Sequence, residues 1–157
     1  MITFKTLVDI AKNGPVYEIN THFLTNDTSF LIGEICVYAT NNDDVVTMIF
    51  ANGAIAFMHH HQNCCESVFI EDINGDLRTL INTPLNVFDE RQQDDPNADE
   101  SATWTFYTLR TIKGSVDIRW YGSSNGYYSE SATIDVFLPK FPLSAHQQTA
   151  LLKEATQ

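Results

Sequence analysis

The sequence predicts an α+β fold that consists mainly of antiparallel β-sheet, with a short N-terminal helix and a C-terminal helix. Two observations predict the sheet. Short runs of β-branched and aromatic residues recur from Val16 onward, and clusters of Asn, Asp and Gly separate them. Apolar residues with helical spacing are found near the two ends of the chain. A chain of 157 residues has the length of a single domain.

The N-terminal half is predicted from its periodicity and its turn signals. Phe4, Leu7 and Val8 follow helical spacing and Gly14-Pro15 ends it, which predicts a helix over 3–13. The expected strands then lie at 16–24, 33–40, 45–50, 54–60, 65–71 and 84–88. Turns are expected at 41–44 and at Asn52-Gly53, and one helical turn is expected at 76–80.

Charge and capping signals organise the rest of the chain. Residues 89–101 hold six acids and one base without apolar periodicity, which predicts a mobile loop. Ser144 and Gln147 have the spacing of a capping box, so a helix is expected at about 144–155.

Residues 103–138 are predicted to form a three-stranded meander. A two-residue loop at Lys113-Gly114 would pair Arg110 with Asp117 and Leu109 with Ile118, and 124–126 would form the second turn. One face is then apolar core. The other face mixes aromatic and polar groups, as recognition surfaces do. The ligand-binding candidates that this face and its turn provide are Trp104, Phe106, Arg110, Arg119, Tyr121, Asn125 and Tyr127.

The charge balance excludes some partners and favours others. Nine Lys and Arg against twenty Asp and Glu give a formal charge of −11. We therefore expect no direct binding to nucleic acid and no docking on anionic membranes. A partner with a basic surface fits better. The acidic residues expected to contact it are Asp43, Asp44, Asp89, Glu90, Asp94, Asp95, Asp99 and Glu100.

The cysteines and histidines are weak evidence for a metal site. Three cysteines, two of them adjacent, do not make a disulfide framework, and Met1 to Ile10 is no secretory signal, so we expect a reduced, cytoplasmic protein. Residues 59–66 are rich in zinc-ligand types but lack the usual spacing, and on a strand His60 would point away from His59 and His61. We predict no cofactor and no catalytic residue. Zinc is the disfavoured alternative, with help from His22 or Asp76, and its candidate ligands are His60, His61, Cys64 and Cys65.

Several stretches resemble a domain of unknown function that is common in phages and bacteria. The two long motifs are 61–68 (HQNCCESV) and 119–130 (RWYGSSNGYYSE), with supporting matches at 31–33, 70–73, 75–77, 101–106 and 111–114. The resemblance covers 31–137 of one domain, and leaves an N-terminal extension (1–30) and a helical tail (141–157) outside. Members typically read Cys-Gly-Asp where this chain has Asn74-Gly75-Asp76, which argues against an all-cysteine metal site. The resemblance implies an origin in a phage or mobile element.

Three functions remain open at this point. The first is a small non-enzymatic protein that binds and inhibits a host defence factor, of the anti-CRISPR kind, by presenting carboxylates to a basic, nucleic-acid-binding partner. The second is a binder of a nucleotide-type signal. The third is a metal-dependent enzyme around His61, Cys64 and Cys65. An exposed third-strand edge and a free C-terminal helix would also allow a homodimer.

Overall fold

The structure is a computed structural model that describes residues 23–138 and 142–155. The predicted helix 3–13 lies outside these residues, and so does most of the predicted strand 16–24. Within the described part, no helix has the length and apolar character needed to cross a bilayer.

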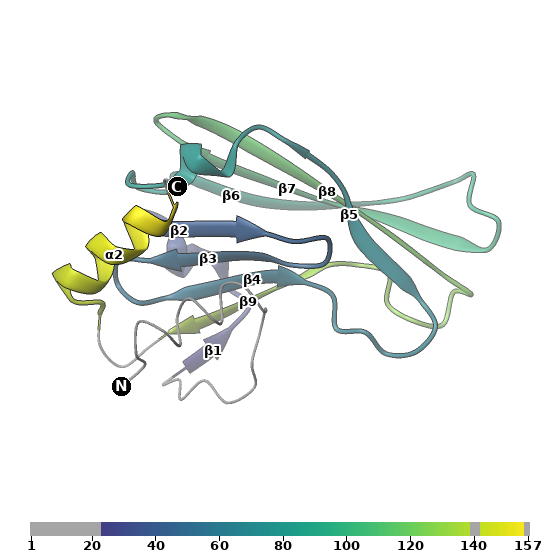
Figure 1. The fold of residues 1–157 in the computed structure, drawn as a ribbon. Helices are drawn as coiled ribbons and strands as arrows, with labels where there is room; N and C mark the ends of the chain where they lie inside the picture. Colours follow the sequence, from purple (N-terminus) through teal and green to yellow (C-terminus); the bar gives the residue numbers. More distant parts are fainter. Residues whose placement is uncertain (1–22, 139–141, 156–157) are drawn as a thin grey trace.

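Two antiparallel sheets form the body of the protein (Figure 1). The five-stranded sheet has the order β1-β9-β4-β3-β2 and contains β1 (Phe23–Thr25), β2 (Cys36–Asn41), β3 (Val46–Phe50), β4 (Ile55–His59) and β9 (Thr133–Leu138). The four-stranded sheet has the order β5-β8-β7-β6 and contains β5 (Ser67–Asn74), β6 (Val87–Asp94), β7 (Ser101–Thr111) and β8 (Gly114–Ser124). With α2 (Ala145–Ala155) these sheets confirm a mainly antiparallel β fold with a C-terminal helix.

The main core lies between the two sheets. Val46, Met48 and Phe50 of β3 belong to the same buried cluster as Ile118 and Trp120 of β8. The other face of the five-stranded sheet carries a second cluster, which consists of Val37, Tyr38, Ile49, Ile55, Phe57 and Leu151. Every residue of β3 and β4 is consequently buried, which explains why these strands read as continuous apolar runs rather than alternating ones.

The short helices and turns agree with the sequence. A 3-10 turn, η1 (Thr28–Leu31), follows β1, and η2 (Leu77–Leu80) is capped by Asp76 as expected for 76–80. The Ser144 amide donates to Gln147 at 3.0 Å and the Gln147 amide donates to Ser144 at 3.2 Å, so the capping box is confirmed. The helix is not free-standing, because it packs on β2 and buries Leu151 completely.

The prediction of a loop over 89–101 is wrong for its first half. Residues 89–94 belong to β6, which pairs with β7 from Val87↔Arg110 to Asp94↔Thr103. This strand lies at the edge of its sheet and is exposed from Asp89 onward, so it is held by backbone hydrogen bonds and not by apolar burial. Charged residues are typical of edge strands, because like charges disfavour edge-to-edge pairing between copies of the same chain.

The β7–β8 hairpin differs from the prediction by one residue at its turn. Ile112 and Lys113 form the loop, and Thr111 pairs with Gly114. Leu109 therefore pairs with Val116, not with Ile118. Each residue of β7 therefore pairs with the residue of β8 that lies two positions before its predicted partner. Because strand side chains alternate with a period of two, both faces of the hairpin keep their predicted composition.

The predicted third strand of the meander is wrong as well. β9 belongs to the other sheet, between β1 and β4, and the second neighbour of β8 is β5. The chain after β8 crosses so closely over Gly122 that an added Cβ would overlap the carbonyl oxygen of Glu130. This crossing carries the chain from one sheet to the other, which periodicity within 103–138 does not reveal.

Candidate functional site

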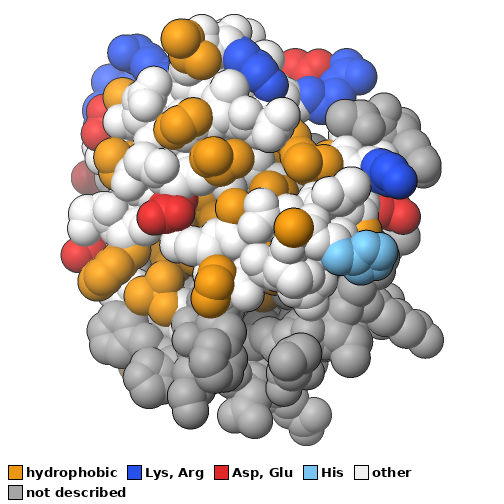
Figure 2. All heavy atoms as spheres, turned by 90° about the vertical axis from the view of Figure 1, so that its left-hand side faces the viewer, with side chains coloured by type: hydrophobic (Ala, Val, Ile, Leu, Met, Phe, Trp, Pro, Cys, Tyr) orange, Lys and Arg blue, Asp and Glu red, His pale blue; other side chains and the backbone are white. Residues whose placement is uncertain are grey.

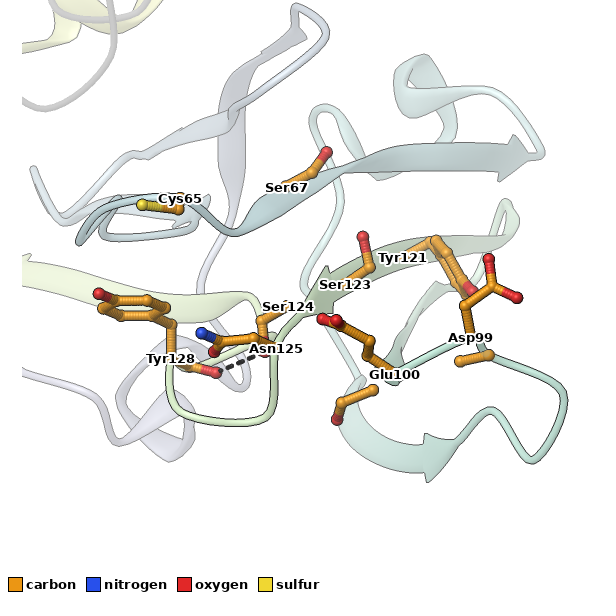
Figure 3. Close-up of a pocket in the computed structure, with 11 residues that line it drawn as sticks. Cys65, Ser67, Asp99, Glu100, Tyr121, Ser123, Ser124, Asn125 and Tyr128 are labelled. Carbon is orange, nitrogen blue, oxygen red and sulfur yellow. Dashed lines mark hydrogen bonds between the residues drawn. The ribbon is translucent and has the colours of Figure 1, made fainter.

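The β6–β7 hairpin tip, the end of β8 and the beginning of β5 lie at one end of the molecule (Figure 1). A pocket opens between them (Figure 3). Its volume is about 650 Å³. The turn after β6 contributes acidic groups, and β8 with the turn that follows contributes hydroxyl, amide and phenol groups. The lining includes Cys65, Ser67, Asp99, Glu100, Ser101, Tyr121, Ser123, Ser124, Asn125 and Tyr128.

The pocket is electrically negative. Asp99 and Glu100 supply carboxylates, and the described residues that line it include no Lys or Arg. Tyr121, which lies beside Asp99 in Figure 3, donates its hydroxyl to Asp95 at 2.8 Å. That hydrogen bond raises the pKa of the Tyr121 phenol, with burial as a smaller cause. The hydrogen bond also anchors the 95–100 turn to β8.

A third carboxylate lies directly behind the lining. Glu130 is buried and accepts hydrogen bonds from Ser101 and Thr103 at 3.0 Å each and from Ser124 at 2.7 Å. Two of these hydroxyl donors, on Ser101 and Ser124, line the pocket. The close crossing over Gly122 holds Glu130 in place. Glu130 is not among the sequence candidates, because the predicted meander places it on the apolar face.

The outer face of β7 and β8 forms an aromatic layer next to the pocket. The ring centroids of Trp104 and Tyr121 are 5.5 Å apart, and those of Phe69 and Tyr121 are 6.2 Å apart. Farther along the face, Arg91 of β6 stacks over Phe106 at 4.5 Å from its ring. Arg91 is not among the sequence candidates, because residues 89–101 are predicted to form a loop.

The ligand-binding candidates do not converge on one pocket. Tyr121 and Asn125 line the acidic pocket, whereas Phe106 and Arg119 line a separate cavity of about 230 Å³. Arg119 donates to Glu71 at 2.8 Å. Arg110 pairs with Ser115 near the far end of the hairpin, and Tyr127 is 84% exposed on its turn.

The acidic candidates divide in a similar way. Asp99 and Glu100 line the pocket, and Asp95 contacts Tyr121. Three more, Asp89, Glu90 and Asp94, are exposed along β6. Asp43 and Asp44 lie in the β2–β3 turn, where the carbonyl of Asp43 accepts from the amide of Ile70 in β5, at the sheet edge opposite β6. The structure therefore does not support a single surface for all eight acids.

His60 and Glu66 form a structural cluster at the β4–β5 connection. His60 Nδ1 lies 2.9 Å from the carbonyl oxygen of Ser131, and Nε2 lies 2.9 Å from Glu66. Glu66 also accepts from the amides of Asn63 at 2.6 Å and Cys64 at 3.0 Å. Burial opposes ionisation of Glu66, but these hydrogen bonds outweigh it and lower the pKa to about 2.

The expectation of unpaired cysteines is wrong for Cys64 and Cys65, which form a disulfide. Both residues lie between β4 and β5, outside either strand, so the alternation of side chains along a strand does not direct them to opposite faces. Neither cysteine then offers a thiolate to a metal. Cys36 is a buried free thiol, and burial raises its pKa to about 12.

His59 and His61 point to the same side and share a partner. Their Nε2 atoms lie 2.7 Å and 2.9 Å from Oδ2 of Asp135 in β9. His60 points the other way, as alternation predicts. Burial lowers the pKa of His59, and the contact with Asp135 opposes that shift. Asp76 caps η2 and does not join this group, and His22 lies outside the described residues.

Comparison with known proteins gives one match. Residues 6–134 match a family model described as "Domain of unknown function (DUF7448)", which extends farther toward the N-terminus than the 31–137 resemblance. No curated protein and no solved structure matches.

Proposed function

Since the chain belongs to the DUF7448 family of domains of unknown function, which assigns no activity, we propose its function from the site itself. The protein is a non-enzymatic binding protein whose acidic pocket receives a basic segment of a partner protein. The observation that carries this proposal is the set of three carboxylates, Asp99 and Glu100 in the lining and Glu130 behind it.

The distribution of charge over the molecule supports binding of the basic partner at the pocket end. Figure 2 views the end opposite the pocket, and lysine and arginine side chains gather along its upper rim. That end includes a second, smaller cavity lined in part by Arg78, Lys113 and Lys153. Basic side chains thus gather away from the acidic pocket, and the negative field of the pocket would accelerate encounter with a cationic partner.

The strand next to the pocket offers a second kind of contact. Among the described strands, β6 pairs only with β7, so one of its edges keeps free backbone donors and acceptors. An extended basic segment could pair with this edge while its side chains reach the acids, which is a common mode of peptide recognition. A host defence effector that binds nucleic acid is the partner class we propose, because its basic channel would accept carboxylates in place of phosphates.

The alternative of a nucleotide-type ligand has less support. The acidic pocket repels phosphates, and the cavity lined by Arg91 and Arg119 is also lined by Asp72 and Asp117, so its two positive charges face two negative ones. The two arginines expected to hold an anion, Arg110 and Arg119, do not line the same cavity.

The test uses an arginine-rich synthetic peptide as the probe and calorimetry as the measurement. We expect Asp99→Asn combined with Glu100→Gln to weaken binding at least about ten-fold, since two charges adjacent to the ligand are removed. The matched control is Asp43→Asn combined with Asp44→Asn, which removes the same charge at the opposite sheet edge. Equal weakening by both pairs would show attraction by net charge alone, and would contradict the proposal.

A further inference from the structure

The end of β4 presents two imidazoles toward the neighbouring strand β9. His59 is the last residue of β4 and His61 follows it two positions later, so both side chains lie on the face that also carries Phe57. Asp135 pairs with Phe57 in the register and reaches both rings from β9. His59 and Asp135 therefore come from adjacent strands, and His61 comes from the beginning of the β4–β5 connection.

We propose that His59, His61 and Asp135 form a binding site for a divalent transition-metal ion of the zinc type. Their donor atoms all lie within 4.8 Å of one another. Ligands bound to zinc at about 2.0–2.1 Å in tetrahedral geometry are separated by roughly 3.3 Å. The Nε2 atoms of His59 and His61 lie 2.7 Å and 2.9 Å from Oδ2 of Asp135. Small side-chain rotations therefore bring the three donor atoms to the spacing of zinc ligands.

The ligand set selects the class of ion. Two imidazoles and one carboxylate suit zinc, cobalt, nickel and ferrous iron, whereas calcium and magnesium prefer oxygen ligands. In the hydrogen-bonded arrangement each Nε2 directs a hydrogen at the same carboxylate oxygen. A metal ion replaces both hydrogens and makes all three contacts at once.

The surroundings leave room for a further ligand. His59 is buried, whereas the side chain of His61 is 51% exposed. Phe57 and Phe137, with ring centroids 5.5 Å apart, belong to the same sheet face and give it an apolar character. Three protein ligands with one side open to solvent are typical of zinc sites that bind water or a substrate in the fourth position.

This site differs from the one that the sequence suggests. Of the four sequence candidates, only His61 takes part. His60 is engaged by Glu66 and Ser131, and Cys64 and Cys65 are joined to each other. The site is also separate from the acidic pocket, whose lining comes from the β6–β7 hairpin tip, from β8 with the turn that follows it and from the beginning of β5, and includes none of the three proposed ligands.

The test is a titration of the full chain, freed of metal with a chelator, with Zn²⁺ by calorimetry and with Co²⁺ by visible absorption. We expect one ion per chain and ligand-field bands of nitrogen–oxygen coordination. His61→Ala should weaken binding at least about ten-fold, since it removes a direct ligand from an exposed position. The matched control is His146→Ala, an exposed histidine on α2.

Three outcomes would contradict the proposal. They are no binding by the wild-type chain, equal binding by the His61→Ala and His146→Ala variants, and loss of binding only when Asp99 and Glu100 are neutralised. Asp135→Asn, which keeps the side-chain shape, should also weaken metal binding. That result would show that the carboxylate acts as a ligand. The metal result does not depend on binding of the basic peptide, so the two proposals can fail separately.

Discussion

His60 and Glu66 form a hydrogen bond of 2.9 Å between Nε2 and Oε1, and both side chains are almost completely buried, at 5% and 0% exposure. His60 follows the last strand residue of β4, and Glu66 precedes the first of β5. The bond therefore joins the two sheets at the point where the chain passes from one to the other. The second ring nitrogen contacts the carbonyl of Ser131, just before β9, so one imidazole fixes both crossings between the sheets.

Replacing Glu66 by Gln should lower the melting temperature at neutral pH. The difference between the variant and wild type should be smaller in acid. The pKa of Glu66 in the folded protein is about 2, well below the ordinary value of 4.5 for a glutamate side chain. A depressed carboxyl pKa contributes stability above the unfolded value, and that contribution is lost as pH falls from about 4.5 toward 2. We expect the melting temperature to fall by about 5 °C or more at pH 7. The difference from wild type should shrink below pH 4.5, as thermal melts at several pH values will show.

The matched control is Glu71→Gln, which removes a carboxylate from an exposed ion pair with Arg119. Exposed ion pairs contribute little to stability, so its melting temperature should stay close to that of wild type. A constant difference between Glu66→Gln and wild type across this pH range would contradict the assignment.

Gly122→Ala should destabilise the protein strongly because the added Cβ would overlap the carbonyl of Glu130. The obstructing atom belongs to the backbone, so relief requires movement of the crossing segment. We expect a loss of about 3 kcal/mol in the free energy of unfolding, measured by urea denaturation. Ser123→Ala, at the next position of β8, is the control and should stay within about 0.5 kcal/mol of wild type. A Gly122→Ala variant as stable as that control would show that the crossing is not tightly packed.

The same crossing marks where sequence reasoning fails. Local signals were sufficient for β3 and β4, for the Asn52-Gly53 turn and for the capping box at Ser144, because each depends on residues close in sequence. Both faces of the β7–β8 hairpin were also predictable, since an error of one residue at the turn preserved the alternation.

Long-range pairing was not predictable in the same way. The partner of β6 is β7, and only backbone hydrogen bonds show that an acidic, exposed segment is an edge strand. Asp135 could not be linked to His59 while residues 133–138 were assigned beside β8, because its contact depends on pairing with β4. The missed residues Glu130 and Asp135 thus both lie in the segment whose sheet was assigned wrongly.

Leu151→Ala tests how α2 is held on the outer face of the five-stranded sheet. Leu151 is completely buried in the cluster that contains Phe57 and Ile55. Removing its side chain leaves a cavity, and the expected loss is about 2–4 kcal/mol in urea denaturation. Leu152→Ala is the comparison on the same helix, and it should lose less because that side chain is only partly buried. Equal small losses would mean that the helix is not docked through Leu151.

Glu130→Gln separates binding from stability at the acidic pocket. In the described structure Glu130 is buried among three hydroxyl donors and forms no ion pair with Lys or Arg. A buried carboxylate without a cationic partner is expensive, so a neutral amide of the same shape should leave the melting temperature unchanged or raise it. The same substitution removes negative charge behind Ser101 and Ser124. It should therefore lower the affinity for the arginine-rich peptide by about three-fold or more. Thermal melts and calorimetry on one protein preparation measure both effects. Weaker binding together with a large loss of stability would instead show that Glu130 is a structural residue, and unchanged binding would remove it from the site.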